Sequence, residues 1–171
     1  MVEQFSIPNQ STSPRLAKFI LMLKDIRSRL FEQIESLSQE ALDYSPHIHK
    51  IETIGTLLLH IAGVEWSWIF EDIDKKDMDM DKWKYAFALR NNFNPPQLTG
   101  KPLNFYTDIL NEVRDDVLKR LNDLQDSELD KLIVSGSDKY SIEWILYHLI
   151  QHESHHIGQI NFLKRSFSLL K

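Results

Sequence analysis

Four of the seven histidines in this chain lie within residues 148–156, at positions 148, 152, 155 and 156. If this segment is a helix, residues four apart share one face, so His152 and His156 are neighbours. An advance of about 100° per residue places both within the apolar stripe of that helix. Two buried imidazoles need partners, because an unsatisfied buried polar group costs about 1–3 kcal/mol. Metal coordination satisfies both, and helical zinc sites use this i, i+4 spacing.

A metal site with an open coordination position commonly has three protein ligands, so a third ligand is expected elsewhere. His60 lies in the middle of another apolar segment. Apolar residues flank His60 on one side, and the small residues Gly63 and Ser67 leave space on the other. The sequence therefore predicts a divalent metal bound by His60, His152 and His156.

The remaining histidines are not expected to bind the metal. On the same helical wheel His148 falls on the shoulder of the stripe and His155 falls beyond it, so both should lie on the surface or beside the ligands. Gln159 falls close to the histidine pair and is a candidate to contact a ligand. His47 and His49 lie in a proline-containing turn and should be exposed.

No site role is predicted for the two glutamates that neighbour the histidines. Glu65 falls on roughly the opposite side of its helix from His60, and Glu153 points away from the apolar stripe that holds His152. The sequence therefore offers no general base apart from what a metal would itself bind.

The elements that must position these histidines are helices, because only 5 glycines and 6 prolines are available as turn signals. Apolar residues recur every three or four positions in four segments, which is the pattern of amphipathic helices. The segments run from the cap Ser13 to a point before Tyr44, from near Thr53 to residues 71–74, over residues 104–124, and from near Ser141 almost to the end. This pattern predicts an all-α fold.

A connection of about thirty residues, 72–103, separates the second and third helices. Loops of this length usually have a function or contain a short helix of their own. We expect a short helix over residues 81–90, and Trp83 and Tyr85 as walls of a pocket above the histidines.

Composition narrows the classes of function. The 171 residues fit a single domain spanning 1–171, and 20 basic against 25 acidic residues give a net charge of −5, which disfavours nucleic acid as a partner. The absence of cysteine excludes disulfides and cysteine nucleophiles. No apolar stretch approaches the roughly 20 residues of a membrane span, and the N-terminus lacks a secretory pattern, so we expect a cytoplasmic protein with no membrane partner.

Two segments resemble a known family. Residues 152–160, His-Glu-Ser-His-His-Ile-Gly-Gln-Ile, resemble the terminal helix signature His-Glu-x-His-His-Arg-Gly-Gln of the DinB-like (YfiT-like) metalloenzyme superfamily. Ile157 stands where that family frequently has arginine. Residues 53–60, Thr-Ile-Gly-Thr-Leu-Leu-Leu-His, with the following Glu-Trp-Ser-Trp at 65–68, resemble its second-helix segment.

The resemblance covers nearly the whole chain and implies a four-helix bundle of up-down-down-up topology with a long crossover between helices 2 and 3. It implies a metal, zinc or nickel, held by one histidine of the second helix and an H-x3-H pair of the fourth. Carried over by position, these are His60, His152 and His156. Members are often homodimers, and some relatives are transferases that use a small cellular thiol.

Three neutral imidazoles leave a dication its full charge, so a bound water has its pKa lowered toward 7 and a bound thiol is deprotonated. The leading hypothesis is a thiol-dependent S-transferase, whose low-molecular-weight thiol must come from a co-substrate because the chain has no cysteine. The catalytic group would be that thiolate or a metal-bound water, and the other substrate a small molecule. The alternatives are a metal-dependent hydrolase, a non-catalytic dimeric bundle that binds a metal or ligand, and a metal-free bundle with hydrogen-bonded histidines.

Overall fold

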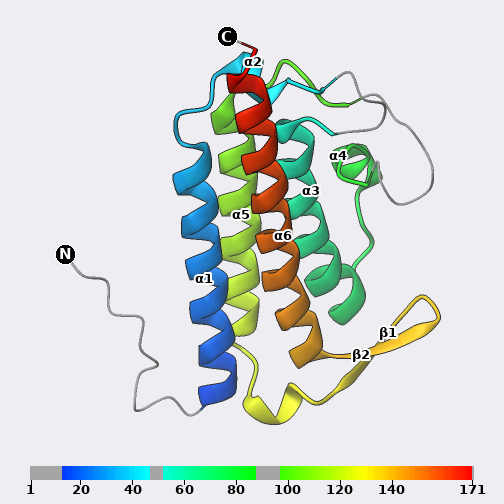
Figure 1. The fold of residues 1–171 in the computed structure, drawn as a ribbon. Helices are drawn as coiled ribbons and strands as arrows, with labels where there is room; N and C mark the ends of the chain where they lie inside the picture. Colours follow the sequence, from blue (N-terminus) through cyan, green and yellow to red (C-terminus); the bar gives the residue numbers. More distant parts are fainter. Residues whose placement is uncertain (1–12, 47–51, 88–96, 171) are drawn as a thin grey trace.

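The structure is a computed structural model that describes residues 13–46, 52–87 and 97–170. Four long helices lie side by side (Figure 1): α1 (Pro14–Ile34), α3 (Ile54–Trp66), α5 (Leu103–Leu121) and α6 (Ile142–Ser168). Helix α3 packs against α5 and α6, and α1 packs against α6 and α5. The predicted helical class is confirmed, and the helices begin within a residue or two of the predicted positions.

Shorter elements lie between the long helices. Helix α2 (Gln39–Leu42) follows α1, and a π-helix, η1 (Ser67–Ile73), continues directly from α3. Helix α4 (Met80–Trp83) lies in the long connection and is shorter than the helix predicted over 81–90, of which residues 88–90 are outside the described part. His47 and His49 are also outside it. A 3-10 turn, η2 (Asp126–Glu128), follows α5.

A β-hairpin lies between η2 and α6 and was not predicted. Strand β1 (Leu132–Ser135) pairs antiparallel with β2 (Asp138–Ser141), with Ile133 opposite Tyr140. Gly136 in the turn has a φ of 60°, which glycine adopts without strain. Each strand has only four residues. The β-branched residues of β1 and the glycine of the turn are a short hairpin signal, which the helical pattern on both sides obscured.

The helix starts predicted near Thr53 and Ser141 are confirmed, and both residues cap their helices. The side chains of Thr53 and Ser141 each accept a hydrogen bond from the backbone N–H three residues further on, at the starts of α3 and α6. These are the helices that carry the three histidines. Each cap satisfies one of the backbone donors that a helix N-terminus leaves unbonded, and so fixes where the helix begins.

The N-terminus of α1 is capped differently from the prediction. The side chain of Ser13 makes no capping hydrogen bond and instead donates to Gln125 at 3.1 Å. Asp126 of η2 caps the helix, since its two carboxylate oxygens accept from the backbone N–H groups of Arg15 and Leu16, both at 2.9 Å. The cap therefore comes from a part of the chain far away in sequence, which a local pattern does not reveal.

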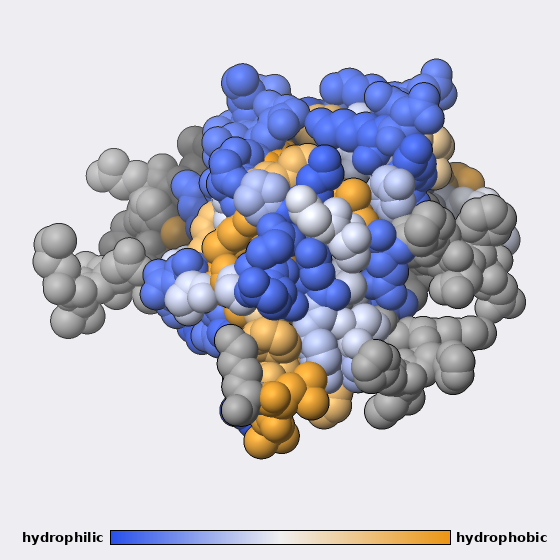
Figure 2. Space-filling view, turned by 90° about the horizontal axis from the view of Figure 1, so that it is seen from above, coloured by the Kyte–Doolittle hydropathy of each residue, from blue (hydrophilic) through white to orange (hydrophobic). Residues whose placement is uncertain are grey.

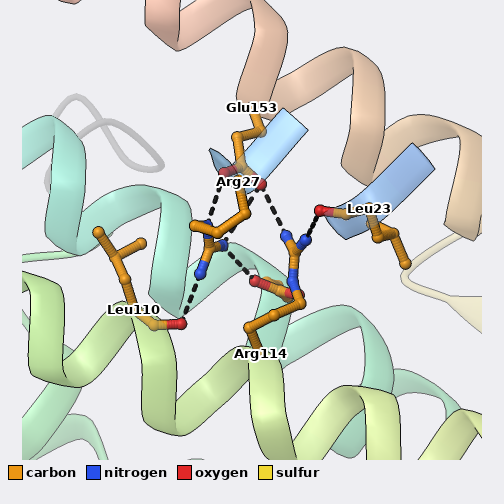
Figure 3. A network of polar contacts seen from close by, with 6 residues as sticks. Leu23, Arg27, Leu110, Arg114 and Glu153 are labelled. Atoms are coloured by element: carbon orange, nitrogen blue, oxygen red, sulfur yellow. Dashed lines mark hydrogen bonds and ion pairs between the residues drawn. The ribbon is translucent and has the colours of Figure 1, made fainter. Parts of the chain in front are cut away.

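Each long helix contributes one charged residue to a network buried between them (Figure 3). Arg27 of α1, Glu65 of α3, Arg114 of α5 and Glu153 of α6 are each at most 4 % exposed. Each arginine bonds both carboxylates: Arg27 lies 2.6 Å from Glu153 and 2.7 Å from Glu65, and Arg114 lies 2.5 Å from Glu65 and 2.7 Å from Glu153. We call these four residues the charge quartet.

The hydrogen bonds of the charge quartet have an approximate twofold symmetry, which relates α1 to α5 and α3 to α6. The Nη1 group of Arg27 donates to the carbonyl oxygen of Leu110, four residues before Arg114, and Nη1 of Arg114 donates to that of Leu23, four residues before Arg27. The Nε group of each arginine binds one glutamate and Nη2 reaches the other. Exchanging α1 with α5 and α3 with α6 therefore reproduces the connectivity.

Burial would normally disfavour four ionised groups, but opposite charges compensate here. Burial opposes charging of Arg27, yet the carboxylates of Glu153 and Glu65 raise its pKa above the ordinary value. Burial likewise opposes ionisation of Glu65, and the guanidinium groups of Arg114 and Arg27 still lower its pKa. The expectation that Glu153 points away from the core is wrong, because the buried face of α6 is wider than the predicted stripe and includes Leu146 and Glu153.

No helix among the described residues is both long and apolar enough to cross a lipid bilayer. Seen along the helices from the end where α6 finishes, most of the described surface is hydrophilic, with smaller hydrophobic areas between (Figure 2).

Candidate metal centre

The three histidines singled out in the sequence lie together between α3 and α6. The Nε2 atom of His152 is 3.2 Å from Nε2 of His60 and 3.0 Å from Nε2 of His156. One ring nitrogen from each residue lies within 4.8 Å of those of the other two. His60 and His156 are buried and His152 is half-buried. No aspartate or glutamate belongs to this cluster among the residues that the structure describes.

The orientation of the His60 ring is set by the segment after α4. Nδ1 of His60 donates to the carbonyl oxygen of Ala86 at 2.5 Å. This approach depends on Gly63, since a Cβ atom there would lie 2.6 Å from Cβ of Ala86 and 3.2 Å from the ring of Trp83. Glycine at position 63 therefore lets the connection pack closely against α3, where the Ala86 carbonyl fixes the orientation of the His60 ring.

His156 is held in a similar way by its own helix. Its Nδ1 donates to Oε1 of Gln159 at 2.6 Å. Since carbonyl oxygens only accept, the rings of His60 and His156 both carry their proton on Nδ1 when neutral. Their Nε2 lone pairs then face the centre of the cluster, and an N–H on the far side of a ligand is the arrangement usual for metal-binding histidines.

The donor set fits a divalent cation. Nε2 of His152 faces the Nε2 atoms of both other rings. One proton on His152 cannot lie along both N···N lines, so protons alone satisfy this cluster incompletely. A cation among the three nitrogens accepts a lone pair from each, and imidazole nitrogen is a preferred ligand of zinc and nickel.

The pKa values of His152 and His156 lie well below 7, so these two rings are neutral near pH 7. Burial, together with the neighbouring His156 and His60 rings, lowers the pKa of His152 to about 2. Burial and His60 also lower the pKa of His156 to about 4, although the hydrogen bond to Gln159 acts in the opposite direction. Metal ligands must be deprotonated, so these two imidazoles need lose no proton before they bind a metal at neutral pH.

The other predicted site residues fall around this cluster. His155 is exposed, with its ring 5.4 Å from that of His156, and His148 is half-buried, 5.8 Å from His152. Trp83 is buried next to Gly63 and Tyr85 is half-buried. Neither lines the cavity described next.

A cavity of about 600 Å³ opens beside the cluster, on the side of Gln159. Its lining combines polar and apolar side chains: Glu52, Leu57, His155, Gly158, Gln159, Phe162 and Leu163. Gln159 thus contacts His156 of the cluster and also faces the cavity. A small molecule in this space would contact Gln159, the hydrogen-bond partner of His156.

Sequence reasoning missed two features that support the centre. The Ala86 carbonyl is a backbone group, and no residue type signals its role. The charge quartet could have been found, because Arg27 and Arg114 each occupy a position within an apolar stripe, directly after Ile26 and Val113. A charged residue in such a stripe suggests a buried partner.

A family model and a curated protein match this chain over most of its length. The family model of the DinB superfamily matches residues 22–160, which include all three histidines and the charge quartet. "Uncharacterized protein YizA" of Bacillus subtilis (strain 168) is 29 % identical over 154 residues, covering 90 % of this chain and 89 % of that protein. With most of its length matched by the family model and its three histidines brought together between two helices, the chain belongs to the DinB superfamily.

Proposed function

We propose that this protein is a metal-dependent enzyme in which His60, His152 and His156 bind a zinc or nickel ion, and that it transfers a small thiol to an electrophilic substrate. The observation that carries the proposal is the convergence of three Nε2 atoms, two of them on rings whose Nδ1 groups donate to carbonyl oxygens. Such an arrangement presents three neutral donors and leaves coordination positions for a substrate.

The composition of the site favours a thiol over water as the nucleophile. A cation bound there would supply Lewis acidity, which lowers the pKa of a coordinating thiol or water. Metal-dependent hydrolases commonly add a carboxylate as general base. The described cluster contains none. Glu65 and Glu153 are ion-paired in the charge quartet, and Glu52 lies in the wall of the cavity outside the cluster. A thiol, with a pKa near 8.5 in water, needs no such base.

The cavity beside the cluster is the proposed site of the thiol. The Glu52 carboxylate and the His155 and Gln159 side chains supply polar contacts for a charged or amine-bearing thiol. The net reaction forms a bond between the sulfur and an electrophilic carbon and breaks the bond from that carbon to its leaving group. The thiol proton passes to solvent or to the leaving group, so no oxidant or reductant is required.

The test combines metal analysis with a thiol-dependence assay. Metal content per chain is measured by elemental mass spectrometry for the wild type and for H60A, H152A and H156A. About one zinc or nickel per wild-type chain, lost in each variant, is expected. H155A is the matched control, because it removes a histidine of the same helix that lies outside the cluster.

Turnover of a small electrophile is then followed with and without an added low-molecular-weight thiol. Turnover that needs the thiol supports the transferase, whereas metal-dependent cleavage without any thiol supports the hydrolase. A fully loaded metal site with no turnover of either kind supports the non-catalytic metal-binding bundle. Absence of metal from the wild type, even after zinc or nickel is added, would overturn the proposal and favour a metal-free bundle.

We also propose that the long helices form the up-down-down-up bundle of the family. The chain directions visible in Figure 1 and the packing of α3 on α5 and of α1 on α6 support this arrangement. The homodimer, the cytoplasmic location and the single domain stay predictions, and analytical ultracentrifugation tests the first of them.

A further inference from the structure

The cavity beside the histidine cluster is lined by the start of α3 and by α6, the two helices that carry the proposed metal ligands. Glu52, just before α3, and Leu57 within it form one part of the wall. The other lining residues follow one face of α6: His155, Gly158, Gln159, Phe162 and Leu163. A volume of about 600 Å³ is in the range of sites for small organic molecules. The cavity can therefore hold a ligand of several carbon atoms.

The cavity has an apolar inner wall and is open to solvent. Leu57 and Leu163 are 2 % and 1 % exposed, so they form the inner wall. Phe162 is 61 % exposed, and a Cβ atom added to Gly158 would meet nothing within 4 Å. A ligand that enters from solvent can thus bury a short hydrocarbon chain against the two leucines.

Glu52 gives this cavity its charge. No lysine or arginine is among the lining residues. Glu52 is half-buried and makes no hydrogen bond or ion pair with any other described residue. It differs in this respect from Glu65 and Glu153, which are ion-paired in the charge quartet. A partly buried carboxylate without a counter-charge favours a cation beside it and disfavours an anion.

The exposed ring of Phe162 supports the same preference. The face of an aromatic ring carries partial negative charge, so it attracts an ammonium group that lies within about 6 Å of its centre. The chain makes such a contact elsewhere, where Nζ of Lys76 lies 4.6 Å from the centroid of the Phe70 ring. The wall of the cavity therefore combines the two kinds of group that bind alkylammonium ions, a carboxylate and an open aromatic ring.

We propose that this cavity binds a cationic aminothiol through its primary ammonium group, and that the Glu52 carboxylate selects such a thiol over neutral and anionic ones. The inference rests on the proposed function and adds the charge of the thiol to it. Glu52 is a specificity-determining residue here, because the ammonium group takes no part in bond formation. The carbon chain of the aminothiol would pack against Leu57 and Leu163, beside Gln159, which holds the His156 ring.

The first test measures binding of unreactive probes to the metal-free full chain. Butylammonium, 1-butanol and butyrate have similar carbon chains and carry a positive, no and a negative charge at pH 7, and ligand-observed NMR titration gives their dissociation constants. We expect butylammonium to bind most tightly and butyrate most weakly. E52Q should weaken butylammonium binding about five- to twentyfold, to near the affinity for 1-butanol, because a charge-assisted hydrogen bond is lost.

The matched control is E32Q, which removes the same charge from an exposed position of α1 that does not line the cavity. It should leave all three dissociation constants unchanged, whereas E52K should reverse the order of butyrate and butylammonium. Equal affinity of the wild type for these two ions would overturn the subsite, as would an equal loss in E32Q or wild-type behaviour of E52Q.

Circular dichroism checks that each variant is folded. If E52Q does not fold, F162L replaces it, since the ring is lost while apolar volume is kept. F162L should weaken the binding of butylammonium about two- to threefold and that of 1-butanol less. An equal effect of F162L on both probes would contradict a cation site at this ring.

Thiol-dependent turnover by zinc-loaded protein then separates this inference from the proposed function. Cysteamine, 2-mercaptoethanol and 3-mercaptopropionate are small thiols with a positive, no and a negative charge. The KM should be lowest for cysteamine and highest for 3-mercaptopropionate in the wild type. E52Q should remove most of this difference, and the comparison with E52Q corrects for the unequal reactivity of the three thiols.

Failure of the two proposals is distinguishable, because the butyl probes need no metal. Thiol-dependent turnover with the same KM ratios in the wild type and E52Q retains the transferase and overturns the selection by Glu52. Binding of butylammonium through Glu52, in a chain that takes up no zinc or nickel, retains an ammonium site in the cavity and overturns the metal-dependent transfer.

Discussion

The carbonyl oxygen of Ala86 lies 2.5 Å from Nδ1 of His60 across 26 residues of sequence. The long connection after η1 thus fixes the ring of one proposed metal ligand, and the contact requires the absence of a side chain at Gly63. The close packing of the connection on α3 and the orientation of the His60 ring therefore depend on each other.

A G63A variant tests this coupling. The added methyl group would meet Cβ of Ala86 at 2.6 Å, so the connection must shift and the His60 ring loses its hydrogen bond. We expect a loss of about 1–3 kcal/mol in unfolding free energy, together with weaker zinc binding. Urea denaturation and zinc titration measure the two effects.

G158A is the control for that substitution. Gly158 lies on α6 beside the cavity, and a Cβ atom there meets nothing within 4 Å. Alanine should stabilise this helix by about 0.5–1 kcal/mol and leave zinc affinity unaltered. If G63A matched G158A in both measurements, the role given to Gly63 would be wrong.

Removal of one charge from the charge quartet should strongly lower the free energy of unfolding. E153Q leaves Arg27 and Arg114 with one carboxylate between them in a buried site. Breaking a buried ion pair in this way costs about 3–5 kcal/mol, and urea denaturation measures the change.

Two further variants identify the cause of that penalty. R15M removes a partly exposed arginine from its pairs with Asp130 and Glu143 and should lower the free energy of unfolding much less than E153Q does, because solvent screens these charges. The double variant R27M/E153Q removes one charge of each sign, so it should be more stable than the sum of its single variants implies. Strict additivity would contradict an electrostatic origin.

The stability of the metal-free protein should fall as the pH drops below about 6.5. The pKa of His152 is lowered to about 2 and that of His156 to about 4, whereas both are near 6.5 in the unfolded chain. Below pH 6.5 the unfolded chain therefore binds protons that the folded chain does not. Each ring should remove up to about 1.4 kcal/mol per pH unit between pH 6 and 4.5.

Urea denaturation of chelator-treated protein at several pH values measures this slope. The double variant H152N/H156N, which cannot take up these protons, should show a smaller slope over the same range. A wild-type slope no steeper than that of the variant would show that the two rings are not buried in neutral form.

The cap of α1 gives a prediction that contrasts two residues. D126A removes the carboxylate that accepts from the N–H groups of Arg15 and Leu16, and should cost about 1 kcal/mol of unfolding free energy. S13A, at the position that the sequence suggests as the cap, should cost less, since the Ser13 side chain makes no capping hydrogen bond and donates to Gln125. Equal losses in urea denaturation would contradict this assignment.

The sequence predicts the helices and the histidine cluster well, because both depend on local periodicity. Thr53 and Ser141 mark helix starts, and the spacing of His152 and His156 alone brings their rings together. The placement of His60 beside them needed only the assumption that two apolar stripes face each other.

The rest depends on contacts between distant segments. Glu153 looks exposed on a wheel drawn for a narrow apolar stripe, but the buried face of α6 is wider and includes it. Asp126 caps α1 across more than a hundred residues, and the π-helix at Ser67 has no established sequence signature. Local sequence patterns cannot predict such features, because each one depends on residues that lie far away in the sequence.

The charge quartet also bears on how the chain folds. Its four ion pairs join residues 38, 39, 49 and 126 positions apart, so no two consecutive helices can complete it. An assembly of two or three helices would bury a guanidinium or a carboxylate without its full set of partners, or else keep that surface hydrated and unpacked. Partly folded forms are penalised for this reason, and the long helices should gain and lose their order cooperatively, in one transition.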